Sequence, residues 1–411
     1  MPPSTADLRA LAARALALLD GEAQTTAWWE RRLAIGEYGV SDIEQLAVDL
    51  VVLRDGRVGT ATTTDVGEAG LAAAAAAAAA HAGLDGDPMG ARHLRDPAEA
   101  RPHRGWDPAV PGLEAAAVAD ELAAVAGTEL EIEWRAGAGR VAIASSRGID
   151  AAEQRSFALA EAAAPGQPAA AAIGPAGVDV AALLAEARAG FHEGAPLPAD
   201  LGDYPVVLGP IAVAQVLEAL KPDLAGPDAA LAARRGTRVA AAAINLSDSP
   251  RHPGTLPRAL DAEGVPRCPV PLIQDGIAHR VVLDTASGAS TGHATRPGHA
   301  DPWPDHLVLV GGGAEDEDAL CAPQQLGLHI PAFLLTAEGG WRLDGARIVE
   351  GGRRTDAATG LADVDPLAVL GATEALTARQ RLVPTDDDSA ITIGATLCPA
   401  LRARSGLTMV G

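Results

Sequence analysis

The chain of 411 residues contains 54 acidic and 32 basic side chains, which give it a formal net charge of −22. This balance excludes a nucleic-acid partner, because a phosphate backbone would be repelled and no cluster of Lys and Arg forms a basic patch. Aromatic residues make up only 3% of the sequence against 48% for all hydrophobic residues, so Ala, Val and Leu must fill the core of a soluble globular protein.

The length predicts two domains, since a single core rarely extends beyond about 250 residues. A segment rich in Pro and Gly, residues 191–205, has the composition of a linker between them. We therefore expect an N-terminal α+β domain over residues 1–190 and a C-terminal β-rich domain over residues 200–411. The predicted fold class is α+β, with helices on an antiparallel sheet in the first domain and antiparallel strands in the second.

The first hundred residues alternate helix and strand signals. Apolar spacing predicts a helix over residues 8–20, and Ser41–Glu44 has the pattern of a capping box. Asp55-Gly56, between an apolar and a β-branched run, predicts a hairpin. Asp65 is the expected N-cap of an alanine-rich helix that ends near His81.

The rest of the first half reads as helix, strands and helix. After a loop over residues 85–111, a helix is expected at 113–127. Residues 129–164 are expected to form three short strands, with turns at Ala136–Gly139 and Ser145–Gly148. The last predicted helix of this half covers residues 178–190.

The second half opens with a predicted strand at 204–208 and a helix at 211–220. Gln274-Asp275-Gly276, between two apolar runs, is a strong hairpin signal because Gly accepts the positive φ that such a turn requires. Strands and turns are expected from there to the carboxyl end, with a helix at about 363–378.

No segment indicates secretion or membrane insertion. The amino terminus leads into a charged amphipathic pattern, and the alanine-rich run Leu71–Ala80 is about half the length that a bilayer crossing needs. We therefore expect a cytoplasmic protein without a membrane partner.

The residues that could bind a metal are few. Cys268, Cys321 and Cys398 lie far apart and are expected to be buried or partly buried reduced thiols. His192-Glu193 lacks the second His of a zinc-protease helix, and Gly194 and Pro196 would break that helix.

The densest group of possible ligands is His293, His299 and His306, with Asp301 and Asp305 between them. Prolines in the same stretch indicate an irregular loop, so hydrogen-bonded or solvated histidines are expected, and a metal site is the alternative.

Two other candidates lack a supporting motif. Ser290 and Thr291 are conceivable nucleophiles, but no GxSxG or SxxK surrounds them. Gly311–Gly313 precedes four carboxylates and lacks a Lys, which indicates a turn and an acidic helix N-terminus instead of a phosphate loop.

The region around the second hairpin also carries a resemblance. Its residues are Asp261–Val265, Leu272–Gly276, Leu283–Thr285 and Ser290–Arg296, with weaker matches at Asp55–Gly59, Thr62–Thr64, Ser146–Gly148, Asp203–Leu208 and Val410–Gly411. In this order the set spans most of the chain and resembles the TldD/PmbA family. Members of that family pair as a zinc-metallopeptidase subunit and a non-catalytic subunit.

The resemblance implies the non-catalytic role. In the peptidase subunit, the strand and helix that correspond to residues 204–222 carry an HExxxH motif, and a cysteine later in the chain adds a ligand. Here Glu218 is retained, but Leu217 stands at the first His and no His follows. Cys398 lacks the glycine-rich surroundings of the family's ligand. The chain therefore resembles the TldE/PmbA-like subunit and is expected to bind no zinc. The resemblance implies that a TldD-like catalytic partner holds the zinc and acts on peptides.

The resemblance also indicates which residues face that partner. The candidates for a subunit interface or substrate channel are Asp261, Glu263, Gly264, Asp284, Ser290, Thr291, Gly292 and His293. Alternatively, these residues shape the fold through glycine turns and hydroxyls that satisfy backbone groups. A second hypothesis is an independent enzyme or binding protein that reuses the fold, for instance in a specialised biosynthetic pathway, with the His293, His299 and His306 loop as its only candidate site.

Overall fold

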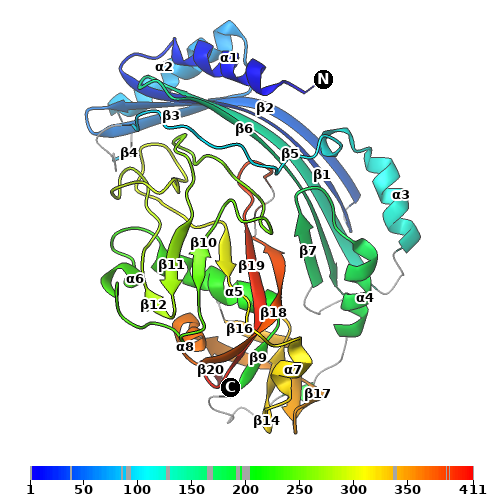
Figure 1. Ribbon diagram of the computed structural model, residues 1–411. Coiled ribbons are helices and arrows are strands. Elements are labelled where there is room, and N and C mark those ends of the chain that lie inside the picture. Colours follow the sequence, from blue (N-terminus) through cyan, green and yellow to red (C-terminus); the bar gives the residue numbers. More distant parts are fainter. Residues whose placement is uncertain are drawn as a thin grey trace.

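The computed structural model describes residues 2–37, 39–84, 87–88, 94–125, 130–163, 170–190, 195–196, 204–336, 340–385, 387 and 389–410. These residues build two sheets, shown in Figure 1 as a long curved sheet above a second, more compact one. The predicted α+β class is confirmed. The predicted domain boundaries stay a prediction, and most of the expected linker, together with His192-Glu193, lies outside the described residues.

The first sheet contains seven antiparallel strands. In spatial order they are β4 (Asp87–Pro88), β3 (Arg57–Thr63), β2 (Gly39–Arg54), β1 (Glu22–Gly36), β5 (Glu131–Ser145), β6 (Asp150–Ala163) and β7 (Ala170–Gly174). Helices α1 (Thr5–Leu16) and α2 (Glu68–Leu84) cover its convex face, while α3 (Ala115–Val125) and α4 (Val180–Gly190) lie toward one end (Figure 1). The 3-10 helix η1 covers Val110–Gly112.

The second sheet contains thirteen strands. Its main path is β12 (Ile277–Ala278), β11 (Val270–Gln274), β10 (Leu246–Asp248), β13 (Leu307–Leu309), β19 (Ala395–Ala403), β9 (Val206–Leu208), β14 (Leu326–Ile330), β16 (Trp341–Glu350), β17 (Arg353–Val364) and β20 (Leu407–Val410). Three strands pair beside this path: β15 (Leu334–Leu335) on β16, β18 (Thr373–Pro384) on β19 and β8 (Ala195–Pro196) on β17. Most pairs are antiparallel as expected, but β13/β19, β9/β14 and β8/β17 are parallel, so the sheet is mixed.

Short helices accompany the second sheet. They are α5 (Pro210–Leu220), η2 (Lys221–Leu224), α6 (Ala230–Ala233), α7 (Glu317–Cys321) and α8 (Pro366–Gly371). The helix predicted at 363–378 is thus only the six-residue α8, because β18 begins at Thr373 and pairs with β19. The acidic helix start predicted after Gly311–Gly313 is present, since Asp316 caps α7 by accepting the Ala319 N–H at 2.8 Å.

The capping box predicted at Ser41–Glu44 is wrong. These residues lie inside β2, where Ser41 pairs with Ala34 and Glu44 with Arg31 of β1. The long β1/β2 ladder uses the backbone groups that a helix would need, and this tertiary pairing outweighs the local signal. The chain's real capping box begins α1, where Ser4 Oγ accepts the Asp7 N–H at 3.2 Å and Asp7 accepts the Ser4 N–H at 2.8 Å.

The turn predicted at Ala136–Gly139 is also wrong, because β5 runs straight through it to Ser145. A Cβ at Gly137 would lie 2.3 Å from Phe157 Cε1, and one at Gly139 would lie 2.8 Å from Ile391 Cγ1. These glycines therefore let a carboxyl-terminal segment pack closely onto the concave face of the sheet. The turn predicted at Ser145–Gly148 is confirmed, with Gly148 at φ 93°.

Both Asp-Gly hairpins are confirmed. Asp55 and Gly56 have φ of 50° and 78°, and Asp275 and Gly276 have φ of 49° and 74°. Positive φ at both central residues is the type I′ arrangement, which matches the twist of the strands that it joins.

The alanine-rich helix α2 lies unusually close to β3. It begins at Glu68, three residues after the expected cap Asp65, which instead accepts the Gly67 N–H at 3.0 Å. A Cβ at Gly59 of β3 would lie 2.2 Å from the carbonyl oxygen of Ala78, so the backbones of β3 and α2 are in direct contact at this point. Near the end of the helix, His81 Nδ1 accepts the Thr60 N–H at 3.1 Å. No described helix combines the length and apolar character that crossing a bilayer requires.

A stacked arginine joins the amino terminus to the helix-covered face of the first sheet. The Arg140 guanidinium lies over two indoles, 5.4 Å from the centroid of Trp29 and 4.6 Å from that of Trp106. It also donates to the Pro3 carbonyl at 2.8 Å. These contacts bring the loop that carries Trp106 against the sheet.

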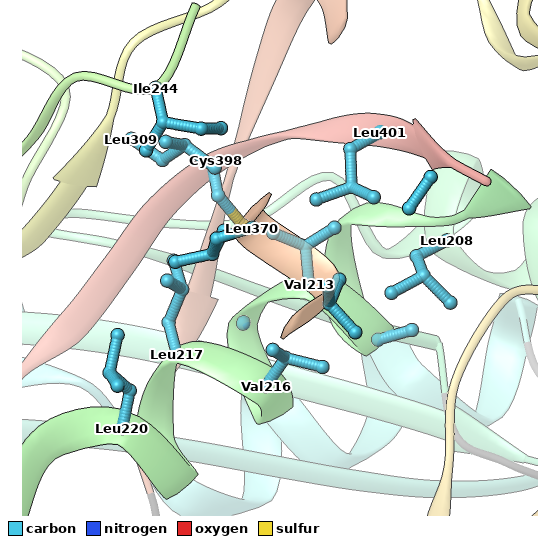
Figure 2. Packing of buried hydrophobic residues seen from close by; sticks show 14 of the residues in the cluster. Leu208, Val213, Val216, Leu217, Leu220, Ile244, Leu309, Leu370, Cys398 and Leu401 are labelled. Atoms are coloured by element: carbon cyan, nitrogen blue, oxygen red, sulfur yellow. The ribbon is translucent and has the colours of Figure 1, made fainter. Parts of the chain in front are cut away.

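The core of the second sheet is aliphatic. Figure 2 shows Val213, Val216 and Leu217 of α5 packed among residues such as Leu208 and Leu401, all fully buried. Cys398 of β19 lies in the same cluster, so it is buried as expected. Cys321 is buried as expected, whereas Cys268 is exposed, contrary to the prediction.

Candidate functional site

The loops singled out by sequence come together in space as one hydrogen-bonded unit. We call residues 261–265, 283–287 and 290–294 the signature loops. Asp261 is their centre: its Oδ1 accepts the N–H groups of Glu263 at 2.9 Å and Val265 at 2.8 Å, and its Oδ2 accepts that of Ala294 at 3.1 Å. Because Asp261 is only 2% exposed, the first loop is closed on itself and tied to the third.

Two further carboxylates bind the second loop. Glu263 accepts hydrogen bonds from the hydroxyl of Thr285 and from its backbone N–H. Asp284, fully buried, accepts the Ser287 N–H at 2.7 Å and the Asp301 N–H at 2.6 Å. Gly264 (φ 74°) and Gly292 (φ 79°) supply turn conformations that side chains disfavour. Of the eight candidates, only Ser290 and Thr291 are half-buried, and the other six are buried.

Thr291, His293 and Asp248 stand in the order of a catalytic triad. Thr291 Oγ1 lies 2.8 Å from His293 Nδ1, and His293 Nε2 lies 3.0 Å from Asp248 Oδ1. The Thr291 hydroxyl, however, already donates to the Leu283 carbonyl at 3.0 Å and accepts the Leu283 N–H at 2.9 Å. It is held as a loop brace and is not positioned as a nucleophile.

The histidines of this region meet at Asp248. His306 donates its backbone N–H to Asp248 at 2.9 Å, while both of its ring nitrogens are buried without a partner among the described residues. Burial holds the pKa of His306 well below its usual value. Burial alone would raise the pKa of Asp248, but His293 and Arg267 outweigh it and hold that pKa far below the ordinary range. In the described part of the chain, no three potential metal ligands converge.

A cluster of buried arginines, which sequence reasoning missed, ties the segment just before the first signature loop and a carboxyl-terminal segment to the first sheet. Arg155 of β6 is 4% exposed and donates to the carbonyls of Pro257 at 2.9 Å, Ile391 at 2.8 Å and Ile393 at 2.8 Å. Next to it, Arg267 donates to Asp305 at 2.8 Å. The available signal was the polar run Glu153–Ser156, which directly precedes the apolar half of the strand.

Glu153, two residues before Arg155, anchors the same junction. It accepts the Ala259 N–H at 2.6 Å and lies 3.2 Å from His103 Nε2. Burial would raise the pKa of Glu153, but His103, Arg258 and Arg155 together lower it, so the carboxylate stays charged. The junction is therefore built from paired charges on both sides.

The end of α5 contains an ion pair between a buried lysine and a half-buried glutamate. Lys221 is 1% exposed, and its Nζ lies 2.7 Å from Glu218 Oε2. The other Glu218 oxygen accepts the Thr396 hydroxyl at 3.3 Å. Across the core, the Cys398 thiol donates to the Pro210 carbonyl at 3.1 Å, and burial holds its pKa well above the usual value. This thiol has the properties of a core side chain.

A cavity of about 810 Å³ lies on the opposite side of the second sheet from the body of α5. We call it the α5–α7 cavity, because the amino-terminal end of α5 and the acidic turn at α7 both reach it. Its remaining walls come from β7, α4, β14, β16, β17 and β18. Its charged lining side chains include Glu186, Glu315, Glu317, Asp318, His329, Arg347, Arg354, Arg379 and Arg381.

Glu263 makes the stability of the signature loops depend on pH. Burial, and then the nearby Asp261, raise its pKa to about 7 from 4.5. The native state therefore holds this proton more tightly than the unfolded chain, and the resulting stability is present below pH 4.5 and lost as pH rises through 7. Relative to wild type, Glu263→Gln should gain about 3 kcal/mol between pH 4.5 and 8. Urea unfolding at a series of pH values measures this, with the exposed Glu131→Gln as control. A constant difference between wild type and Glu263→Gln would contradict it.

Comparisons with known proteins agree on the fold. Residues 201–354 match the family model described as PmbA/TldA metallopeptidase C-terminal domain. The chain superposes on TldE from Thermococcus kodakarensis with a TM-score of 0.81 at 17% identity, covering 99% of this chain and 100% of that one. A putative modulator of a DNA gyrase from Thermotoga maritima gives 0.76 at 16% identity, with 98% and 99% covered.

A putative modulator of DNA gyrase from Bacteroides thetaiotaomicron is similar to the same extent, with a TM-score of 0.74 at 16% identity and 98% of each chain covered. No curated protein matches the sequence. At these identities the solved structures establish the fold, and the matched family model covers the region that contains α5 and the signature loops.

Proposed function

The chain belongs to the TldD/PmbA family, and from this premise we propose that it is the non-catalytic subunit of a heteromeric zinc metallopeptidase. In this proposal a TldD-like partner holds the zinc and the general-base glutamate. The present chain completes the channel through which a peptide reaches that zinc.

The observation that carries the proposal is the state of the helix that would hold the zinc. Leu217, at the place of the first histidine, is fully buried in the aliphatic core (Figure 2). Pro222, four residues after Glu218, lies in the 3-10 helix η2 and has no ligand atom in its side chain. Zinc needs imidazole, thiolate or carboxylate donors that converge, so the described residues of this helix do not fit the ion.

A side chain of this protein supplies positive charge there instead. The Lys221 ammonium sits 2.7 Å from Glu218, whose second oxygen is bound by Thr396. Both oxygens of Glu218 are thus already engaged, one by a cation and one by a hydroxyl, although its side chain is 36% exposed. In our proposal, the Lys221–Glu218 ion pair therefore stands where a catalytic subunit would have its zinc and its general base.

The signature loops act mainly as scaffold in this view. Asp261, Glu263 and Asp284 use their oxygens for hydrogen bonds inside these loops and to the segment that follows them. The accessible part is the tip of the second and third loops, where Gly288 and Ala289 are exposed beside the half-buried Ser290 and Thr291. We propose that this tip faces the substrate channel or the partner.

Purification of the two chains separately and together tests the proposal. We expect less than about 0.1 zinc per isolated chain, because the α5 residues cannot hold the ion. Peptidase activity is expected only when the TldD-like partner is present. In the complex, Glu218→Gln should keep activity within about twofold, because a glutamate bound to Lys221 takes no part in the chemistry.

The matched comparison is the same substitution of the motif glutamate in the partner, which should abolish activity. Stoichiometric zinc with peptidase activity in the isolated chain would contradict the proposal. A hundredfold loss caused by Glu218→Gln would contradict it as well, since Glu218 would then belong to the active site.

The alternative, an independent enzyme or binding protein, finds less support. Its candidate site was the loop of His293, His299 and His306. His293 is engaged with Thr291 and Asp248, and among the described residues no group of three ligands forms there. Metal analysis of wild type and His293→Ala distinguishes the two proposals directly.

A further inference from the structure

One half of β2 forms a free edge of the first sheet. On one side, β1 pairs with β2 from the Gly36/Gly39 pair to the Glu22/Leu53 pair without interruption. On the other side, β3 pairs only with Val48–Arg54. In the part of the chain that the structure describes, no strand lies beside residues 40–46 on that side.

The backbone groups of this edge point outward in a regular row. Alternate residues of an antiparallel strand direct their N–H and C=O groups to opposite sides. The two-residue hairpin at Asp55-Gly56 closes with the Arg54/Arg57 pair, so Arg54 and every second residue before it are directed toward the side of β3. The even-numbered residues from Val40 to Leu46 therefore present four N–H and four C=O groups that no described residue binds.

The edge also has the regularity and the exposure that strand addition requires. The register of β1 and β2 is continuous, without a bulge, and Gly39–Arg54 contains neither Pro nor Lys. Residues 39–44 are all exposed, including Val40 at 53% and Ile43 at 47%. A straight, exposed edge with apolar side chains is a template on which another chain can add a strand.

Two carboxylates limit which strand can be added. Asp42 binds Arg31 at 2.6 Å, and Glu44 Oε1 accepts the indole N–H of Trp29 at 2.7 Å. The other carboxylate oxygen of Glu44 has no partner among the described residues. Because side chains alternate along a strand, Asp42 and Glu44 lie on one face of the edge, and Ile43 lies on the opposite face.

A second copy of this chain fits the edge poorly. If Ile43 lies opposite Ile43 of a second copy, then each Asp42 lies opposite a Glu44. A shift of two residues in either direction places Asp42 opposite Asp42 or Glu44 opposite Glu44. Like charges directly opposite each other destabilise strand pairing, so this edge discriminates against self-association.

We propose that residues 40–46 are the docking edge for the TldD-like partner, which adds an antiparallel strand with Lys or Arg opposite Asp42 and Glu44. The inference rests on the proposed function for the identity of the partner. The main chain supplies the hydrogen bonds of the added strand, and the charge pairs distinguish the partner from a second copy. The net charge of −22 on this chain also attracts a cationic strand.

Sedimentation of the two full-length chains in mixture measures this association. Ile43→Asp should weaken the complex at least about tenfold, because it places a carboxylate in the apolar centre of the edge. Glu44→Lys should weaken it to the same extent, because a cation then lies opposite a cation. Val310→Asp is the matched control, since Val310 is an equally exposed valine (49%) in the second half of the chain and should bind like wild type. Thermal unfolding checks that each variant is folded.

The isolated chain gives a second readout, in which Glu44→Lys acts in the opposite direction. The substitution puts a cation opposite Asp42 of a second copy, so this variant should self-associate at least about tenfold more tightly than wild type. Asp42→Lys combined with Glu44→Lys puts cation opposite cation and should remove that gain.

Two results would overturn the inference and leave the subunit proposal standing. One is a complex that keeps wild-type affinity with Ile43→Asp and Glu44→Lys, or a Glu44→Lys chain that self-associates no more than wild type. The other is self-association of the wild-type chain that Ile43→Asp abolishes, since the edge would then bind a second copy. The absence of any complex between the two wild-type chains would overturn the proposed function itself, and the choice of partner with it.

Discussion

Arg155→Met is expected to lower the free energy of unfolding by about 3 to 5 kcal/mol. The arginine donates to three carbonyls at 2.8–2.9 Å, and those carbonyls belong to two segments of the second half of the chain. Burial and the neighbouring Arg258 lower its pKa to about 10, so it is still charged at neutral pH. Methionine keeps most of the volume but leaves the carbonyls and the nearby Glu153 without their cation.

Urea unfolding followed by circular dichroism measures this loss. Arg9→Met is the control, because Arg9 forms an exposed pair with Asp150 at 3.3 Å and should change stability by no more than about 0.5 kcal/mol. If Arg155→Met lies within about 1 kcal/mol of wild type, then the buried arginine does not hold the segments of Pro257 and Ile391 to the first sheet as we infer.

Gly59→Ala should cost about 3 kcal/mol, although it adds a single methyl group. The new Cβ would lie 2.2 Å from the Ala78 carbonyl oxygen and 2.3 Å from the Ala82 nitrogen. Both atoms belong to the backbone of α2, which cannot yield as a side chain can. Either α2 moves away from the sheet and opens gaps between its alanines and the sheet, or β3 distorts.

The control lies in the same helix. No described atom is within 4 Å of a Cβ at Gly83, so Gly83→Ala should stabilise the protein by up to about 1 kcal/mol through helix propensity. Differential scanning calorimetry of both variants gives the comparison. A Gly59→Ala protein as stable as wild type would mean that α2 and β3 are not in backbone contact in solution.

Sequence reasoning succeeded where local chemistry decides the outcome. The two Asp-Gly turns, the helix α5 and the acidic start of α7 follow from residues within four or five positions of each other. The candidate residues of the signature loops also lie together, because their glycines and short acidic or hydroxyl side chains are those that build turns.

Sequence reasoning failed where contacts between segments far apart in the chain determine the structure. Ala136–Gly139 has the composition of a turn. Its glycines instead lie in β5, because the side chains of Phe157 and Ile391 leave no room for a Cβ at these positions. Ser41–Glu44 has the pattern of a helix start, but β1 offers it a complete ladder of hydrogen bonds. The arginine junction depends on residues more than a hundred positions apart, such as Arg155 and Ile391, which no local pattern can connect.

The two indoles around Arg140 give this protein a built-in optical probe. Trp106 is held against the sheet by a loop, whereas Trp29 belongs to β1, and both face the same guanidinium. When the loop lifts off, Trp106 leaves the cation and enters water, while Trp29 stays in the sheet. In a variant that keeps Trp106 as its only tryptophan out of the six, the emission would therefore report the docking of this loop separately from the melting of the strands, without any added dye.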